Sequence, residues 1–157
     1  MEIKLIGIGK TDKTELDQLI KSYQNRLMHY VRFSFEIIPD LKNSKNLSEK
    51  LQKEEEGKLI LSKISNSDRL ILLDENGQEM NSVGFSDFLQ KQMNSGLKRL
   101  VLVIGGPYGF SEDVYKKASS KLALSKMTFS HQMVRLFIIE QLYRSFTILK
   151  NEPYHHR

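Results

Sequence analysis

The sequence contains no cysteine, which excludes disulfide bonds and thiolate metal ligands and is consistent with a reducing compartment. It also lacks an apolar run long enough to cross a membrane, and charged residues interrupt the N-terminal segment where a signal peptide has its apolar core. Internal repeats and low-complexity tracts are absent. We therefore expect a cytoplasmic protein that binds no membrane and forms a single domain over residues 1–157, a length sufficient to bury a core.

Metal-binding patterns are also missing from the chain. The four histidines, His29, His131, His155 and His156, include no pair at the i, i+4 spacing of a zinc-binding helix, and we expect no metal site. The net charge is +5, with 24 basic against 19 acidic side chains. This surplus favours a polyanionic partner such as RNA, although many basic proteins bind no nucleic acid.

The hydrophobic pattern alternates between strands and helices along the chain. Apolar runs predict strands, and apolar residues spaced three or four apart predict helices. The expected strands cover residues 2–9, 33–38, 69–74, 99–104 and 121–126, and the expected helices cover 14–30, 48–64, 82–93, 112–118 and 130–149. Residues 40–46 are polar and are expected to form a loop, and Glu75-Asn76-Gly77 is expected to form the turn that ends the third strand.

Two of these strands, at 70–73 and 100–104, are continuously apolar. This pattern is typical of central parallel strands that are covered on both faces. The alternation predicts an α/β fold with an open, mainly parallel sheet and helices on both faces. Ligands bind such sheets beyond the carboxyl ends of the strands. We therefore expect three segments to meet there: the residues after Leu73, the glycine turn at 105–109, and the segment 127–131.

Two glycine motifs are candidates for a ligand-binding loop. The turn Gly105-Gly106-Pro107-Tyr108-Gly109 lets backbone approach a ligand closely, or it is a plain tight turn. Its spacing is not that of a dinucleotide-binding fingerprint. The second motif, Gly9-Lys10-Thr11, resembles the end of a phosphate-binding loop, but position 4, where that pattern requires glycine, is lysine. Only the turn at 105–109 remains a candidate ligand site.

The last expected helix is apolar almost all round, so it requires cover on more than one side. A small sheet covers one face, and a second subunit in an isologous homodimer would cover the other. Arg135 interrupts the apolar stretch and is expected to have a specific partner. Glu140 and Arg144 lie one helical turn apart and are expected to pair.

Several segments, taken together and in order, resemble one family. They are the opening strand IKLIGIGK, the strand LILLDENG, the turn VIGGPYGF, the segment LALSKMTFSHQMVR, the helix IIEQLYR and the closing PYHHR. They are similar, essentially end to end, to the ribosomal RNA large subunit methyltransferase H family, within the SPOUT class of knotted methyltransferases. The resemblance implies a C-terminal trefoil knot, S-adenosylmethionine as methyl donor, a homodimer, and methylation of N3 of a pseudouridine in 23S rRNA on the assembled ribosome.

The resemblance also implies roles for individual residues. The cofactor-binding positions are Leu73, Gly105 with its neighbour Gly106, Leu124, Ser125, Lys126, Met127, Thr128 and Phe129. The catalytic positions are His131, Arg135, Tyr154 and His155. The expected RNA contacts are Arg135, Arg144 and Tyr154. Histidine suits proton removal from N3, arginine suits stabilisation of the anionic base, and tyrosine suits stacking on a flipped nucleobase. The sequence does not decide which residue takes the proton.

Two other functions stay open at this point. One is a non-catalytic ribosome- or RNA-binding protein of the same fold, against which binding of S-adenosylmethionine would argue. The other is an α/β enzyme that acts on a small nucleotide, whose activity would be insensitive to salt. The tail Pro153-Tyr154-His155-His156-Arg157 is likewise either a frayed end or a lip that closes over the target base.

Overall fold

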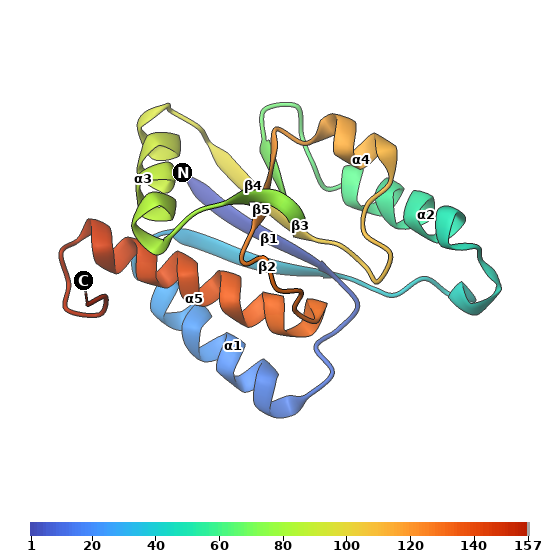
Figure 1. The fold of residues 1–157 in the computed structure, drawn as a ribbon, viewed down its shortest axis with the longest axis horizontal. Coiled ribbons are helices and arrows are strands. Elements are labelled where there is room, and N and C mark those ends of the chain that lie inside the picture. The colour runs from blue at the N-terminus through green and yellow to red at the C-terminus, as the bar shows by residue number, and fades with distance from the viewer. Residues whose placement is uncertain (157) are drawn as a thin grey trace.

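The computed structural model describes residues 1–156, and Arg157, the last residue of the tail, lies outside the described residues. One sheet is formed by β1 Glu2–Ile8, β2 Arg32–Ile38, β3 Arg69–Glu79, β4 Arg99–Ile104 and β5 Ser120–Ala123 (Figure 1). The helices are α1 Thr14–Leu27, α2 Glu49–Leu61, α3 Ser82–Asn94, α4 Glu112–Lys117 and α5 His131–Leu149, with a short 3-10 helix η1 at Ser44–Asn46. The strand order is β2-β1-β4-β3-β5 and all neighbouring strands are parallel, which confirms the expected sheet.

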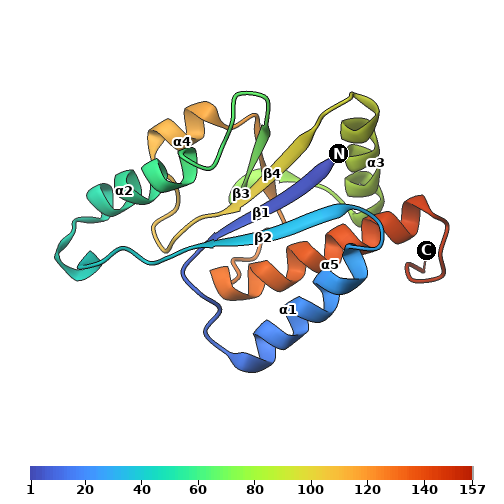
Figure 2. The same cartoon turned by 180° about the vertical axis from the view of Figure 1, so that it is seen from behind.

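Each face of the sheet has its own hydrophobic core, because successive side chains of a strand point to opposite faces. In β1, Ile3 and Leu5 belong to one core, and Ile6 and Ile8 belong to the other. Helices α1, α3 and α5 cover the first face, and α2 and α4 cover the second (Figures 1 and 2). The helices therefore lie on both faces, as expected, and this double cover accounts for the continuously apolar sequence of β4.

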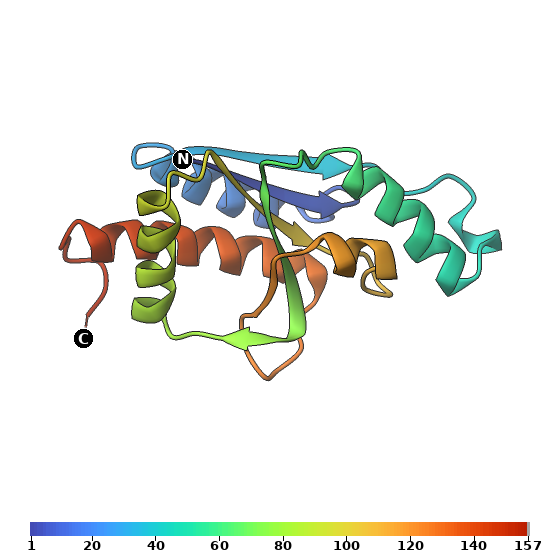
Figure 3. The ribbon, with the colours of Figure 1, turned by 90° about the horizontal axis from the view of Figure 1, so that it is seen from above.

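Helix α5 packs between α1 and α3 as well as on the sheet (Figure 3). These two neighbours cover flanks of α5 that the sequence analysis assigned to a second subunit. Most of its apolar circumference is thus buried within one chain. The apolar side chains left exposed lie around its N-terminal end, where Met127 is 75% exposed and Phe129 and Met133 are each 37% exposed.

Side-chain caps fix where four of the helices begin. Ser48, Asn81, Ser111 and Ser130 each accept a hydrogen bond from the backbone N–H three residues further on. The cap at Ser130 starts α5 at His131 and so ends the loop that leaves β5. That loop is longer than expected, since β5 ends at Ala123 and not at Lys126.

The expected turn at Glu75-Asn76-Gly77 is wrong, because β3 continues to Glu79. The pairing of β3 with β5 changes register between Leu73 and Gln78, both of which pair with Leu122. A Cβ on Gly77 would lie only 2.6 Å from the backbone N of Leu122. Glycine is therefore needed here for the close approach of two backbones, at an irregularity that bends β3. The C-terminal trefoil knot implied by the resemblance stays a prediction.

We expect Gly77→Ala to lower the free energy of unfolding by about 2–3 kcal/mol, because the added methyl forces β3 and β5 apart. A suitable control is Gly96→Ala after α3, where φ is +76° and no atom lies within 4 Å of the added Cβ. That variant loses only about 1 kcal/mol, from the strain of the left-handed backbone. Denaturant unfolding of both proteins measures the difference, and equal losses would contradict the proposed backbone contact.

Candidate functional site

A cavity of about 500 Å³ opens at the carboxyl ends of β4 and β5, beside the middle of β3. Its wall consists of Leu73, Asp74, Glu75, Asn76, residues 104–110, Tyr115, Leu122, Leu124, Ser125, Met127, Thr128, Phe129, His131 and Val134. The three segments that the sequence predicted to meet do meet in this cavity. Its volume lies in the range of sites for small organic ligands.

The expected cofactor-binding residues all line the cavity except Lys126, which is exposed on the same loop. Asp74, Glu75 and Asn76 belong to the segment after Leu73 that was expected at this site, but none of the three was predicted as a cofactor-binding residue, because residues 75–77 were assigned to a turn. Their position after the buried residues of β3 was the signal that could have identified them. Tyr115 was also missed, and it reaches the cavity from α4 without any pattern in the sequence.

Neighbouring side chains leave little room for a side chain at Gly105 or Gly106 in the glycine turn. A Cβ on Gly105 would lie 3.1 Å from Cζ of Phe110, which is buried behind the turn. A Cβ on Gly106 would collide with the carboxyl group of Glu56 from α2. Gly109 alone in the turn uses a positive φ, of 81°, and its N–H donates to the carbonyl oxygen of Gly106 at 3.1 Å. The turn therefore presents backbone to the cavity, with side chains only at Pro107 and Tyr108.

An ionised carboxylate lies in the cavity wall at Asp74. Burial raises its pKa, but a 2.6 Å hydrogen bond from the Tyr115 hydroxyl, a hydrogen bond from the Asn76 N–H and the charge of Lys121 outweigh burial and hold the pKa below its ordinary value. Burial and the same hydrogen bond raise the pKa of Tyr115 to about 12. The pair thus places a fixed negative charge beside the glycine turn.

A second contact joins two walls of the cavity. The Thr128 hydroxyl donates to Oε2 of Glu75 at 2.8 Å, which ties the loop after β5 to the extension of β3. On the same loop the N–H of Met127 donates to Oγ of Ser125 at 3.0 Å. Together with Asp74, the Glu75 carboxylate makes this rim acidic, which suits a cationic ligand.

Arg135 has a specific partner, as expected, but it is the end of β1. Its side chain is 0% exposed. Nη2 donates to the carbonyl oxygen of Ile8 at 2.7 Å, and Nη1 donates to Oγ1 of Thr11 at 3.2 Å. Burial lowers its pKa, while the charges of Asp12 and Asp40 oppose that shift. Its guanidinium is enclosed and ties α5 to β1, and its expected roles in catalysis and RNA contact stay predictions.

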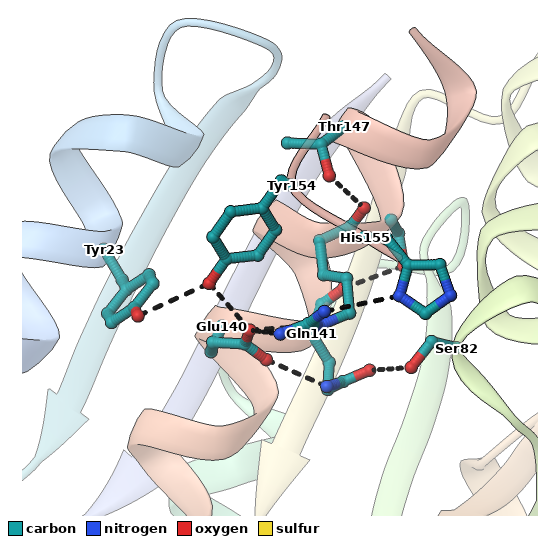
Figure 4. Close-up of polar contacts among 9 residues, drawn as sticks. Tyr23, Ser82, Glu140, Gln141, Thr147, Tyr154 and His155 are labelled. Carbon is teal, nitrogen blue, oxygen red and sulfur yellow. Dashed lines mark hydrogen bonds and ion pairs between the residues drawn. The ribbon is translucent and has the colours of Figure 1, made fainter. Parts of the chain in front are cut away.

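The tail folds back on the C-terminal end of α5 rather than fraying (Figure 4). The Tyr154 hydroxyl donates to Oε1 of Glu140 at 2.9 Å and lies 3.4 Å from the Tyr23 hydroxyl. Burial and these hydrogen bonds raise the pKa of Tyr154. The Arg144 guanidinium lies 4.7 Å from the centre of the Tyr154 ring and donates to Glu140 at 2.5 Å, which confirms the expected Glu140–Arg144 pair. The ring of Tyr154 is thus held inside its own chain.

His155 is oriented by the same network. Nη1 of Arg144 lies 3.3 Å from Nδ1 of His155, and a guanidinium has only donors, so Nδ1 accepts. The proton of the neutral ring is therefore on Nε2, which points away from Arg144. By contrast, His131 at the other end of α5 is exposed and lies in the cavity wall.

The cavity is lined by His131 and Val134, at the N-terminal end of α5. The C-terminal end of the chain lies beside the opposite end of the helix (Figure 3). Within one chain, the structure therefore brings together the expected cofactor residues and His131. Tyr154 and His155 instead contact Glu140 and Arg144, which are nine and thirteen residues further along α5 than His131, or roughly 14 and 20 Å along the helix axis. Across residues 1–156, no cluster of three histidine, cysteine or acidic side chains could hold a metal ion. None of the helices in that part of the chain is both long and apolar enough to span a bilayer.

We expect Tyr115→Phe to raise the pKa of Asp74, since the largest hydrogen bond to its carboxylate is removed. A depressed carboxyl pKa contributes stability that is present above the ordinary pKa of about 3.8 and lost as pH falls through the folded-state value. The variant should therefore be less stable than the parent at neutral pH, by about 1 kcal/mol, with the difference shrinking in acid. Tyr108→Phe, at the exposed rim, is the control, and carboxyl NMR titration measures the shift. An unchanged Asp74 pKa would contradict the assignment.

Comparisons with known proteins agree with this geometry. A family model described as a predicted SPOUT methyltransferase matches residues 1–155. The chain is 69% identical over 157 residues to the ribosomal RNA large subunit methyltransferase H proteins of Christiangramia forsetii and Flavobacterium johnsoniae, with 100% of each chain covered. The protein of that name from Parabacteroides distasonis is 61% identical over 156 residues, 99% of both chains.

Among solved structures, a probable methylase family protein from Haemophilus influenzae Rd KW20 superimposes with a TM-score of 0.52 at 11% identity, over 95% of this chain and 66% of that one. At that identity the likeness concerns the fold. The family is shown by the model that matches nearly the whole chain and by the high identity to relatives over its full length. This chain belongs to the ribosomal RNA large subunit methyltransferase H family of SPOUT methyltransferases.

Proposed function

We propose that this S-adenosylmethionine-dependent rRNA methyltransferase modifies N3 of a pseudouridine in 23S rRNA of the assembled ribosome, in the cytoplasm. Its family membership supports the class of reaction. The observation that carries the proposal is the cavity beside the carboxyl ends of β4 and β5 and the middle of β3, where backbone without side chains, apolar side chains and acidic groups converge.

The residues present fit S-adenosylmethionine. Leu73, Leu124 and Phe129 offer apolar surface for an adenine ring, and the glycine turn offers backbone groups without side chains in the way. The carboxylates of Asp74 and Glu75 suit the positive charges of a sulfonium and an amino group. When bound, this cofactor supplies an activated methyl group, and the protein's part is to fix its position and exclude water.

The two candidate histidines suit different tasks. His131 lies in the cavity wall, so its ring is the nearer candidate to accept the proton that leaves N3. Nδ1 of His155 is occupied by Arg144, so His155 enters the reaction through Nε2–H. That donor suits a carbonyl oxygen next to N3, where negative charge grows as the proton leaves.

A homodimer would bring the cavity of one chain and the tail of the other together in one site. The exposed side chains of Met127, Phe129 and Met133 lie beside the cavity and form apolar surface that a second copy would cover. If two α5 helices run antiparallel across a twofold axis, the tail of each chain reaches the cavity of the other. Arg144 is partly exposed next to the tail and is the better-placed RNA contact of the two arginines considered.

Purified protein should transfer labelled methyl groups from S-adenosylmethionine to ribosomes, and mass spectrometry of the digested 23S rRNA should find N3-methylpseudouridine. Gly105→Val should abolish cofactor binding by calorimetry without unfolding the chain, since the new side chain has no space beside Phe110. Pro107→Ala, in the exposed part of the turn, is the control. Normal binding by Gly105→Val would move the cofactor elsewhere, and label on a different nucleotide would reject the substrate.

Removal of residues 154–157 should leave cofactor affinity and dimerisation intact and remove most methyl transfer. Tyr154→Ala should act similarly, because it frees the tail from Glu140 and Arg144. Tyr154→Phe keeps the ring and loses the hydroxyl, so its rate should fall between those of Tyr154→Ala and the parent. Methylation of ribosomes by the truncated chain at the parental rate would show that the tail takes no part.

A further inference from the structure

Glu56 is a buried acidic residue on α2 that the proposed reaction does not use. The residue is 3% exposed, in a helix whose other acidic side chains face solvent. Its carboxyl group faces the glycine turn of the cavity. A Cβ placed on Gly106 would lie 2.9 Å from both Cδ and Oε1 of Glu56, and closer still to Oε2. The carboxyl group thus fills the space that any other residue at position 106 would need.

The polar partners of this carboxyl group are few. Nε2 of Gln52 donates to Oε1 at 3.0 Å. Oε2 is buried and has no hydrogen-bond partner among the described residues. Burial raises the pKa of Glu56, the hydrogen bond from Gln52 opposes that shift, and the charge of Asp40 adds to it. Burial therefore makes ionisation of Glu56 less favourable than ionisation of an exposed glutamate, because the buried carboxylate has a single hydrogen-bond donor.

Within residues 1–156, Gln52 and Asp40 are the groups that shift the pKa of Glu56, and neither is a cation. Asp40, in the segment after β2, lies against Gly9 in a similar way, because a Cβ on Gly9 would lie 2.7 Å from its Oδ1. Gln52 on α2 is neutral, and the turn itself contributes no charge. Arg135 on α5 interacts with Asp12 and Asp40. Ionisation of Glu56 would therefore add a second negative charge near Asp40 and directly behind the turn.

We propose that Glu56 is a positioning residue for the cofactor: its carboxyl group, packed against Gly106, holds the turn at 105–109 in the shape that binds S-adenosylmethionine. This inference rests on the proposed cofactor cavity. Glu56 does not line that cavity and acts through the backbone of the turn. A methyl group at position 106 would meet the end of the Glu56 side chain and displace the carboxyl group or the turn, so the two positions are coupled.

A pH profile separates this role from general stability. The dissociation constant for S-adenosylmethionine is measured by calorimetry from mildly acidic to alkaline pH. A carboxyl group with a raised pKa is protonated below that pKa, so cofactor affinity should be highest there and fall as pH rises through it. Glu56→Gln keeps the size and the neutral state, so it should match the parent in acid and lose less affinity than the parent at higher pH. Comparing the two profiles cancels every pH dependence that the two proteins share, including that of the cofactor.

A double-mutant cycle tests the contact directly. Gly106→Ala alone should weaken cofactor binding about tenfold or more, since its methyl group meets the carboxyl group. In a Glu56→Ala background the same change should cost little, because the space has been vacated. Glu55→Ala, one position away and exposed, is the control and should leave the effect of Gly106→Ala unchanged. Circular dichroism confirms that each variant is folded.

The outcomes are distinct. Parallel pH profiles for the parent and Glu56→Gln, or an equal cost of Gly106→Ala with and without Glu56, would overturn the positioning role while leaving the cofactor site intact. Absence of binding by the parental protein would overturn both the cofactor site and this inference. Two results together would establish the positioning role of Glu56. The cofactor affinity of Glu56→Gln would depend less on pH than that of the parent, and Gly106→Ala would cost little affinity in the Glu56→Ala background.

Discussion

The structure depends on close approach of backbone at the carboxyl edge of a parallel sheet. Three glycines permit it: Gly77 against the backbone of β5, Gly105 against Phe110 and Gly106 against Glu56. None of the three needs a left-handed backbone, since their restriction is space. A side chain at any of them would push apart the β3 extension, the glycine turn or α2, and these segments form or support the wall of the cavity. The same lack of side chains that lets the strands pack leaves backbone available to a ligand.

Around this edge, polar contacts hold neighbouring segments together. The buried Arg135 ties the start of α5 to the end of β1, Asp74 ties β3 to α4 through Tyr115, and Thr128 ties the loop after β5 to Glu75. Each contact joins residues far apart in the sequence. The cavity therefore depends on the complete fold.

The sequence alone predicted the sheet, its two-sided cover and the meeting of three segments, because parallel α/β topology follows from alternating apolar runs and helical periodicity. The sequence-based prediction was wrong at residues 75–77, because polar residues followed by a glycine are typical of a turn. In the structure, Gly77 instead allows the backbones of β3 and β5 to approach closely. The packing of the Glu56 carboxyl group against Gly106 could not be predicted either, because such a tertiary contact produces no periodic pattern in the sequence. The burial of Arg135 was equally invisible, since the sequence gives no distance between its guanidinium and the end of β1. The family resemblance supplied the cofactor residues, which spacing alone did not identify.

In the proposed homodimer, a complete site needs the cavity of one chain and the tail of another. Mixed dimers test this arrangement most directly. Chains carrying Gly105→Val are expected to lose cofactor binding and keep an intact tail, and chains lacking residues 154–157 are expected to have the reverse defect. Each protein alone should be inactive on ribosomes. After dissociation and reassociation of an equal mixture, roughly a quarter of parental activity should return, because half of the dimers are mixed and each holds one complete site. No recovery in a mixture shown to contain mixed dimers would contradict the claim.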